Sequence, residues 1–89
     1  MRTESFDFDE IVDQAHFFRQ FSHRLALTDL TVTDLEGLRE VMKAGVLSFP
    51  LEIIFIHLGK GQKPRYGALI QLFEEAEEEL EGQLRFSIR

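Results

Sequence analysis

The sequence contains no cysteine and no tryptophan, and its 89 residues include only two prolines and one tyrosine. Without cysteine the chain cannot form disulfides, use a thiolate as a nucleophile or build cysteine-ligated zinc sites. This composition agrees with a reducing compartment, so we expect a cytoplasmic protein. Residues 1–7 lack the basic start and apolar run of a signal peptide, and the longest apolar stretch, residues 51–58, is too short to span a bilayer.

Positive charge is also scarce. The chain has 10 Lys and Arg residues against 16 Asp and Glu residues, which gives a net charge of −6. Nucleic acids and anionic membranes are negatively charged and select basic surfaces. The composition therefore argues against both, and a basic protein is the complementary partner.

The hydrophobic content of 44% is enough for one domain over residues 1–89 with a modest core. Nine phenylalanines supply most of the packing volume, and a phenyl ring has no polar group that needs a partner when it is buried. We therefore expect most of these rings inside the protein.

The hydrophobic periodicity predicts an α/β fold with the order β-α-α-β-α-β. Strands alternating with crossover helices favour a small three-stranded parallel sheet packed with about three helices. Gly45 and Gly82 mark helix ends, Pro50 leads into a strand, and residues 59–65 form a polar loop. The predicted strands cover residues 5–9, 51–57 and 84–89, and the predicted helices cover residues 13–27, 33–43 and 65–80.

The helix at residues 33–43 is the best candidate for a functional surface. Thr33 or Asp34 can cap its first turn, and Glu36 and Glu40 are spaced i, i+4, so their carboxylates lie one above the other. The opposite side is apolar and would face the core through Leu35, Leu38 and Met42.

Three other groups of residues have simple structural interpretations. Asp7 and Asp9 have the Asp-x-Asp spacing of aspartyl-phosphate enzymes, but the rest of such a site is missing. We therefore interpret Asp7 as a residue at the edge of a strand and Asp9 as a turn residue. The segment Gly59-Lys60-Gly61 lacks the spacing of a phosphate-binding loop. No metal-ligand spacing links His16, His23 and His57, so we predict neither a metal site nor a cofactor.

Catalysis is also not predicted. The sequence offers no Ser/His/Asp or Cys/His set, and a glycosidase pair formed by Glu36 and Glu40 would need an enclosed sugar cleft for which the domain has little room. The glutamates at residues 74–81 are most simply a solvated helix face. Their mutual repulsion is easier to understand if some of them meet a cationic partner.

Several segments along the whole chain resemble the barstar family, whose members are small bacterial intracellular inhibitors of ribonucleases. The likeness is greatest to a poorly characterised bacterial branch that shares Phe6-Asp7-Phe8-Asp9-Glu10-Ile11 and His57-Leu58-Gly59. The segments that carry the wider resemblance are Leu25-Ala26-Leu27, Asp34-Leu35-Glu36-x-Leu38, Pro50-Leu51, Gly67-Ala68 and Phe73-Glu74-Glu75-Ala76.

The resemblance implies a barstar-like fold and an inhibitor that fills a ribonuclease active site with carboxylates imitating RNA phosphates. By resemblance, Glu36 and Glu40 match two acidic positions of the family's second helix, and Glu75 and Glu79 match acidic positions of its last helix. Such carboxylates attract the basic cleft of an RNA-binding enzyme and form charge-assisted hydrogen bonds in it. We expect a monomer when the partner is absent.

The chain departs from the family's best-known member at positions that bear on the choice of partner. Leu30, Thr31, Val32 and Thr33 replace an aromatic pair, a glycine and an acid, and Arg39 replaces a tryptophan. Arg39 also places a positive charge between Glu36 and Glu40. We therefore expect a different basic ribonuclease or a related toxin. An immunity protein for a toxin that is not a ribonuclease, and a protein-binding adaptor, remain alternatives.

Overall fold

The computed structural model describes residues 2–25, 32–44, 50–59 and 61–89. Its element order confirms the predicted β-α-α-β-α-β arrangement and adds one short 3-10 helix, η1. The strands are β1 (Arg2–Asp7), β2 (Leu51–Ile56) and β3 (Leu84–Ile88), and the helices are α1 (Gln14–Arg24), α2 (Leu35–Lys43), η1 (Lys63–Tyr66) and α3 (Gly67–Glu79).

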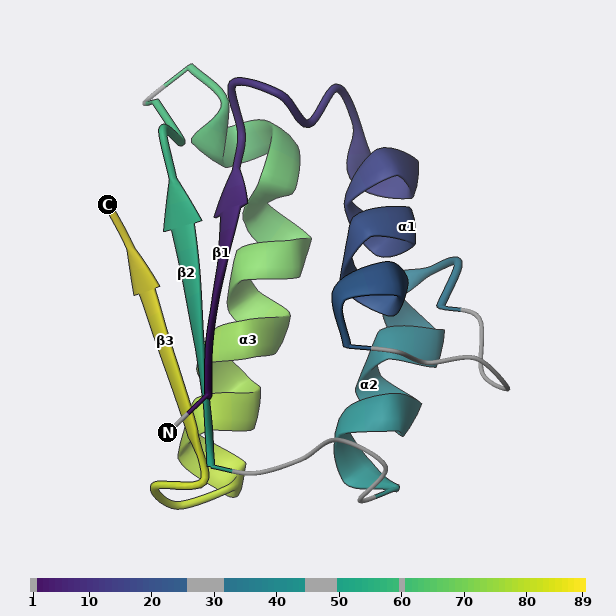
Figure 1. Ribbon diagram of the computed structural model, residues 1–89, viewed down its shortest axis with the longest axis vertical. Helices are drawn as coiled ribbons and strands as arrows, with labels where there is room; N and C mark the ends of the chain where they lie inside the picture. The colour runs from purple at the N-terminus through teal and green to yellow at the C-terminus, as the bar shows by residue number, and fades with distance from the viewer. Residues whose placement is uncertain (1, 26–31, 45–49, 60) are drawn as a thin grey trace.

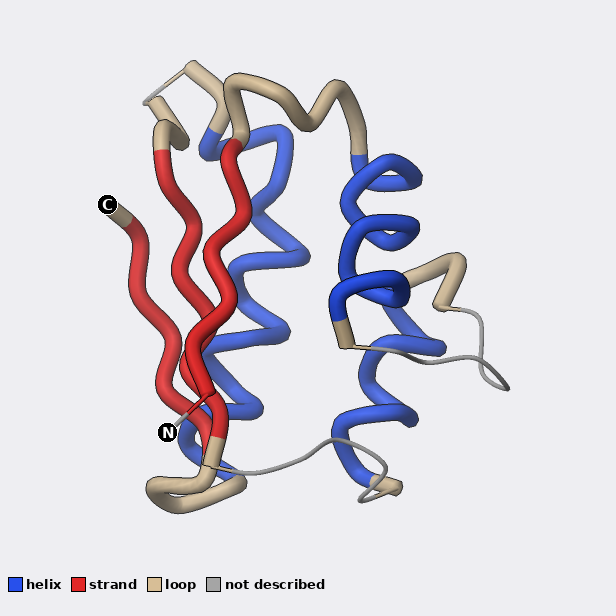
Figure 2. Tube along the Cα trace, viewed as in Figure 1, coloured by secondary structure: helices blue, strands red, loops and turns tan. Residues whose placement is uncertain are grey.

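The three strands form one parallel sheet in the order β1-β2-β3. Phe6 pairs with Phe55, and Ile53 pairs with Phe86. Figure 1 shows the strands running in the same direction, and Figure 2 shows the helices lying to one side of them in this view. The parallel arrangement brings the carboxyl ends of β1 and β2 to the same edge of the sheet.

Aromatic rings fill the space between the sheet and the helices, as the composition predicts. The Phe17 ring on α1 lies 5.0 Å from the Phe6 ring and 5.4 Å from the Phe55 ring, measured between centroids. The Phe73 ring on α3 lies 5.4 Å from the Phe55 ring. These contacts join α1, α3 and the two adjacent strands β1 and β2 in one core. Among the residues that the structure describes, the buried phenylalanines are Phe6, Phe8, Phe17, Phe18, Phe21, Phe55 and Phe73.

The ends of several elements differ from the predicted ones. The first strand begins at Arg2 and ends at Asp7, so Asp9 lies in the turn that follows. Helix α1 ends at Arg24, three residues before the predicted end, and Asp13 caps its start as expected. The predicted helix end at Gly45, and most of the segment between the first two helices, lie outside the described residues.

The second half of the chain shows two further differences. Strand β2 stops at Ile56 because His57 has a left-handed backbone with φ of 60°, which cannot continue a strand. Part of the predicted loop forms η1, so α3 starts at Gly67 rather than Arg65. After α3, Gly82 adopts a φ of 88°, the conformation expected of a glycine that follows a helix.

Among the described residues, no helix has both the length and the apolar character required to cross a membrane.

Candidate functional site

Of the two predicted capping residues, Asp34 caps helix α2, which begins at Leu35. The Asp34 Oδ1 atom accepts a hydrogen bond from the backbone N–H of Gly37 at 2.7 Å. Leu38 and Met42 are buried as predicted, Leu35 is partly buried, and Val41 is an additional buried residue. The apolar side of α2 therefore fixes which of its residues face outward.

The outward residues of α2 include the predicted acidic pair and two cations. Glu36 and Glu40 are exposed, as are Arg39 and Lys43. On the helix circumference, Arg39 lies between Glu36 and the buried Met42, so the cations are on the side of α2 nearer to α3. The acidic pair occupies the next strip of the helix surface.

Helix α3 presents its own acidic pair to α2. Glu75 and Glu79 are spaced i, i+4 and flank the buried residues Leu72 and Ala76. A shallow hollow between the two helices has an apolar floor and a charged rim. It is lined by Arg39, Met42, Lys43, Leu72, Glu75, Ala76 and Glu79.

One ion pair crosses this hollow. An Arg39 guanidinium nitrogen, Nη2, lies 3.7 Å from the Glu75 Oε2 atom, and both side chains are about half exposed. The other Glu75 carboxylate oxygen accepts a hydrogen bond from the Gln71 side-chain amide at 3.1 Å. Glu75 therefore has one polar neighbour on each of the two helices.

The remaining glutamates of α3 and the following turn do not form one uniform surface. The Glu77 Oε2 atom accepts a hydrogen bond from the Phe86 backbone N–H at 2.9 Å and so joins α3 to the edge strand β3. Glu74, Glu78 and Glu81 are exposed to solvent. The run predicted as a solvated face thus includes one residue with a structural contact and two residues beside α2.

The structure brings Arg39, Glu75 and Glu79 together at the hollow, and it places Glu36 and Glu40 on the adjoining surface of α2. Lys43 is a charged member of the rim that sequence reasoning missed. Its i, i+4 spacing from Arg39 could have indicated it. Across the two helices the charges alternate in three strips. The strip of Glu36 and Glu40 is followed by the strip of Arg39 and Lys43, and then by the strip of Glu75 and Glu79.

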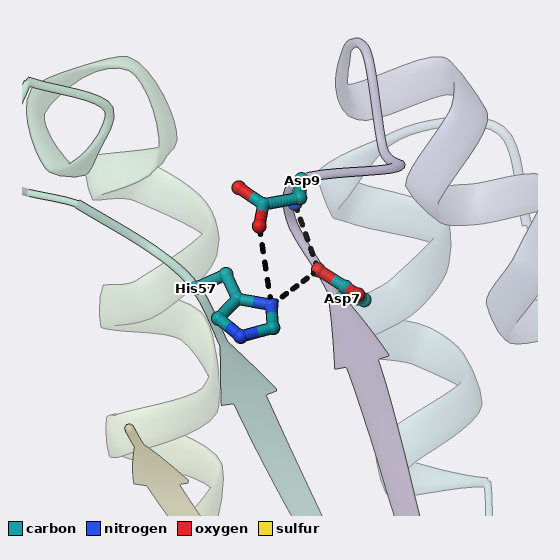
Figure 3. A group of neighbouring side chains, drawn as sticks. All are labelled: Asp7, Asp9 and His57. Carbon is teal, nitrogen blue, oxygen red and sulfur yellow. Dashed lines mark hydrogen bonds and ion pairs between the residues drawn. The ribbon is translucent and has the colours of Figure 1, made fainter.

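A second group of charged side chains lies at the carboxyl edge of the sheet. The His57 Nδ1 atom is 2.8 Å from Asp7 Oδ1 and 3.3 Å from Asp9 Oδ2 (Figure 3). The sequence pattern links Asp7 with Asp9 but gives no reason to place His57 beside them. The rule that carboxyl ends of parallel strands share one edge could have brought them together.

The hydrogen bond between Asp7 and His57 changes the acidity of both groups. It raises the pKa of His57 above its ordinary value, and the charges of Asp7 and Asp9 act in the same direction. The same hydrogen bond, followed by the one from the Asp9 backbone N–H, lowers the pKa of Asp7. Each charged form is stabilised by the other residue.

The observed fold and the face shared by α2 and α3 define a small α/β protein with a parallel sheet and a strongly charged helical surface. Comparison with models of known protein families matches residues 1–88 to the family described as Barstar (barnase inhibitor). The chain belongs to the barstar family. Members of this family are inhibitors rather than enzymes, and membership implies a ribonuclease as the protein partner.

Proposed function

We propose that this protein is an intracellular inhibitor of a basic ribonuclease and that it blocks the enzyme's active site with carboxylates of α2 and α3. The main support is the arrangement of Glu36, Glu40 and Glu75 on two adjacent helices of a barstar-family protein. Glu79 supports them at the rim of the hollow. In this proposal the free inhibitor is a monomer and performs no catalysis.

The physical basis is electrostatic complementarity. An enzyme that binds a polyanion holds Arg, Lys and His side chains in its cleft, and exposed carboxylates that enter the cleft take the place of the phosphates. The net charge of −6 favours the encounter at long range. Glu36 and Glu40 are exposed and can enter such a cleft without breaking contacts in the core.

Arg39 makes the surface selective. A basic cleft repels the Arg39 guanidinium unless the partner places an acidic or other hydrogen-bond acceptor group opposite it. Arg39 and Lys43 stand between the two acidic strips, so the partner must match an alternation of charge rather than a uniform negative patch. We infer that the cognate ribonuclease carries an acceptor group beside its basic cleft.

The test measures RNA cleavage by purified basic ribonucleases in the presence of the protein. We expect inhibition of at least one such enzyme, and we expect the triple variant Glu36→Gln, Glu40→Gln, Glu75→Gln to lose most of it. The matched control changes Glu74, Glu78 and Glu81 to Gln, which removes the same net charge from positions away from α2. Equal inhibition by the two triple variants would mean that inhibition depends only on the overall charge of the protein, and this would contradict the proposal.

Arg39 also supports a second candidate, in which the partner is a toxin that is not a ribonuclease. Capture of partners from the source cell with the purified protein, followed by mass spectrometry, distinguishes the two candidates. A third candidate is an adaptor that binds through another surface. In that case, charge reversal by Glu36→Lys and Glu40→Lys would leave the captured proteins unchanged.

A further inference from the structure

Asp7, Asp9 and His57 come from distant parts of the sequence and converge at the carboxyl edge of the sheet (Figure 3). Asp7 is the last residue of β1, Asp9 lies in the turn after it, and His57 directly follows β2. One carboxylate oxygen from each aspartate and one imidazole nitrogen lie within 4.8 Å of one another. None of the three residues lines the hollow between α2 and α3.

We propose that these three side chains bind a divalent transition-metal ion, with Zn²⁺ as the best-fitting member of that class. An imidazole with two carboxylates is a donor set that suits Zn²⁺, since the nitrogen ligand favours transition metals over Mg²⁺ and Ca²⁺. Three protein ligands leave at least one coordination position for water. The exposure of the His57 and Asp9 side chains gives the ion direct access from solvent.

The distances between the donor atoms fit one shared ion. Around a tetrahedral Zn²⁺ with bonds of about 2.0–2.1 Å, neighbouring ligand atoms lie about 3.3 Å apart, and octahedral geometry brings them to about 3.0 Å. The observed distances from His57 Nδ1 are 2.8 Å to Asp7 Oδ1 and 3.3 Å to Asp9 Oδ2. The donor oxygens of Asp7 and Asp9 lie within 4.8 Å of each other, so movements of the exposed Asp9 and His57 side chains can bring the three donor atoms around one ion.

The backbone at both ends of the site is held in place. The N–H of Phe8 donates to the Ile56 carbonyl at 2.9 Å, and the N–H of His57 donates to the Arg89 carbonyl at 3.1 Å. Phe8 is buried in the aromatic core, between the two aspartates in sequence. Because the ligands are attached to a packed sheet edge, little conformational entropy remains to be lost when the ion binds.

The Asp7 carboxylate also has a supporting contact of the kind that orients metal ligands. Its Oδ1 atom accepts a hydrogen bond from the Asp9 backbone N–H at 2.9 Å. The ion would replace the proton that His57 Nδ1 shares with this oxygen. It would then link residues that are 50 positions apart in the sequence and clamp the ends of β1 and β2 together.

The test is a calorimetric titration of the untagged chain of residues 1–89 with ZnCl₂ at about pH 8, above the ordinary pKa of a histidine side chain. We expect one ion per chain and a thermal unfolding midpoint that rises with Zn²⁺ concentration. Replacing His57 by Asn should weaken binding by at least about tenfold. Asn removes the imidazole and tolerates the left-handed backbone observed at this position.

A matched control replaces both His16 and His23 by Ala and should leave Zn²⁺ binding unchanged. The Asp9→Asn variant provides a second ligand deletion, at a solvent-exposed side chain, and it should also weaken binding. Absence of binding by the unmodified protein, or equal binding by His57→Asn, would overturn the assignment. Displacement of Zn²⁺ by a moderate excess of Mg²⁺ would contradict a site selective for transition metals.

Discussion

Arg39 of α2 and Glu75 of α3 face each other across the hollow between the two helices, with 3.7 Å between the guanidinium nitrogen and the carboxylate oxygen. The contact joins a cation that lies beside the acidic pair of α2 to the acid that α3 contributes to the proposed inhibitory surface. Because both side chains are about half exposed, the pair is weak and can be exchanged for contacts with a partner.

The first prediction concerns the exchange at Arg39. Arg39→Gln should change the free energy of unfolding by less than about 0.5 kcal/mol, because exposed ion pairs contribute little. It should nevertheless weaken inhibition of the cognate enzyme, since the partner loses the guanidinium group. Urea unfolding and inhibition assays measure the two effects separately.

Lys43→Gln is the matched control for Arg39→Gln, because it removes the same charge from the rim and leaves the Arg39–Glu75 pair intact. Arg39→Gln should weaken inhibition more than Lys43→Gln does. Equal inhibition by the two variants would show that Arg39 serves only as a general positive charge.

The second prediction concerns the carboxylate that joins α3 to β3. Glu77→Ala should lower the free energy of unfolding by about 1–2 kcal/mol, because the Phe86 N–H loses a charged acceptor. Glu78→Ala removes the same charge from an exposed neighbouring position and should stay within about 0.5 kcal/mol of the unmodified protein. Chemical denaturation of the three proteins measures the difference, and equal stability of the two variants would remove the proposed role of the hydrogen bond.

The third prediction concerns the cap of α2. Asp34→Ala should destabilise the protein by about 1 kcal/mol, because the Gly37 N–H loses its side-chain acceptor. Thr33→Ala should have a much smaller effect, since Thr33 is exposed and the cap hydrogen bond is made by Asp34. Hydrogen exchange at the Gly37 amide, measured with urea unfolding, should become faster only in Asp34→Ala.

Local patterns were sufficient to predict the order of elements and much of the core. Phe17, Phe18 and Phe21 have the spacing of one face of an amphipathic helix, and all three are buried in α1, because the period of such a helix is a property of the sequence itself. Leu69, Leu72, Phe73 and Ala76 also have helical spacing and are buried in α3. Strict alternation also gave the last strand nearly to the residue.

Contacts between segments that are distant in the sequence could not be predicted from local patterns. The left-handed backbone at His57 ended β2 one residue early, although the residue types favoured a continued strand. The contact between Asp7 and His57 depends on the parallel pairing of β1 with β2, and no local pattern specifies that register. The ion pair between Arg39 and Glu75 at the candidate site could not be predicted from local patterns either, because it depends on how α3 packs against α2.

The last prediction concerns the pH dependence of the Asp7–His57 pair in a buffer containing a metal chelator. The pKa of His57 is raised in the folded protein, so its contribution to stability is complete below the ordinary value of 6.5 and is lost as pH rises through the folded value. The pKa of Asp7 is lowered, so its contribution is present above the ordinary value of 3.8 and is lost as pH falls through the folded value.

Asp7→Asn should therefore destabilise the protein most between these two ordinary values, 3.8 and 6.5, and the loss should shrink under alkaline conditions. Denaturation at about pH 5.5 and about pH 8.5 measures the change, and NMR titration of the His57 ring should show its pKa returning toward the ordinary value in the variant. Glu10→Gln is the control, because it removes one negative charge from an exposed position in the same turn. A loss of stability in Asp7→Asn that is equal at both pH values would mean that the hydrogen bonds of the Asp7 side chain act without the charge of His57.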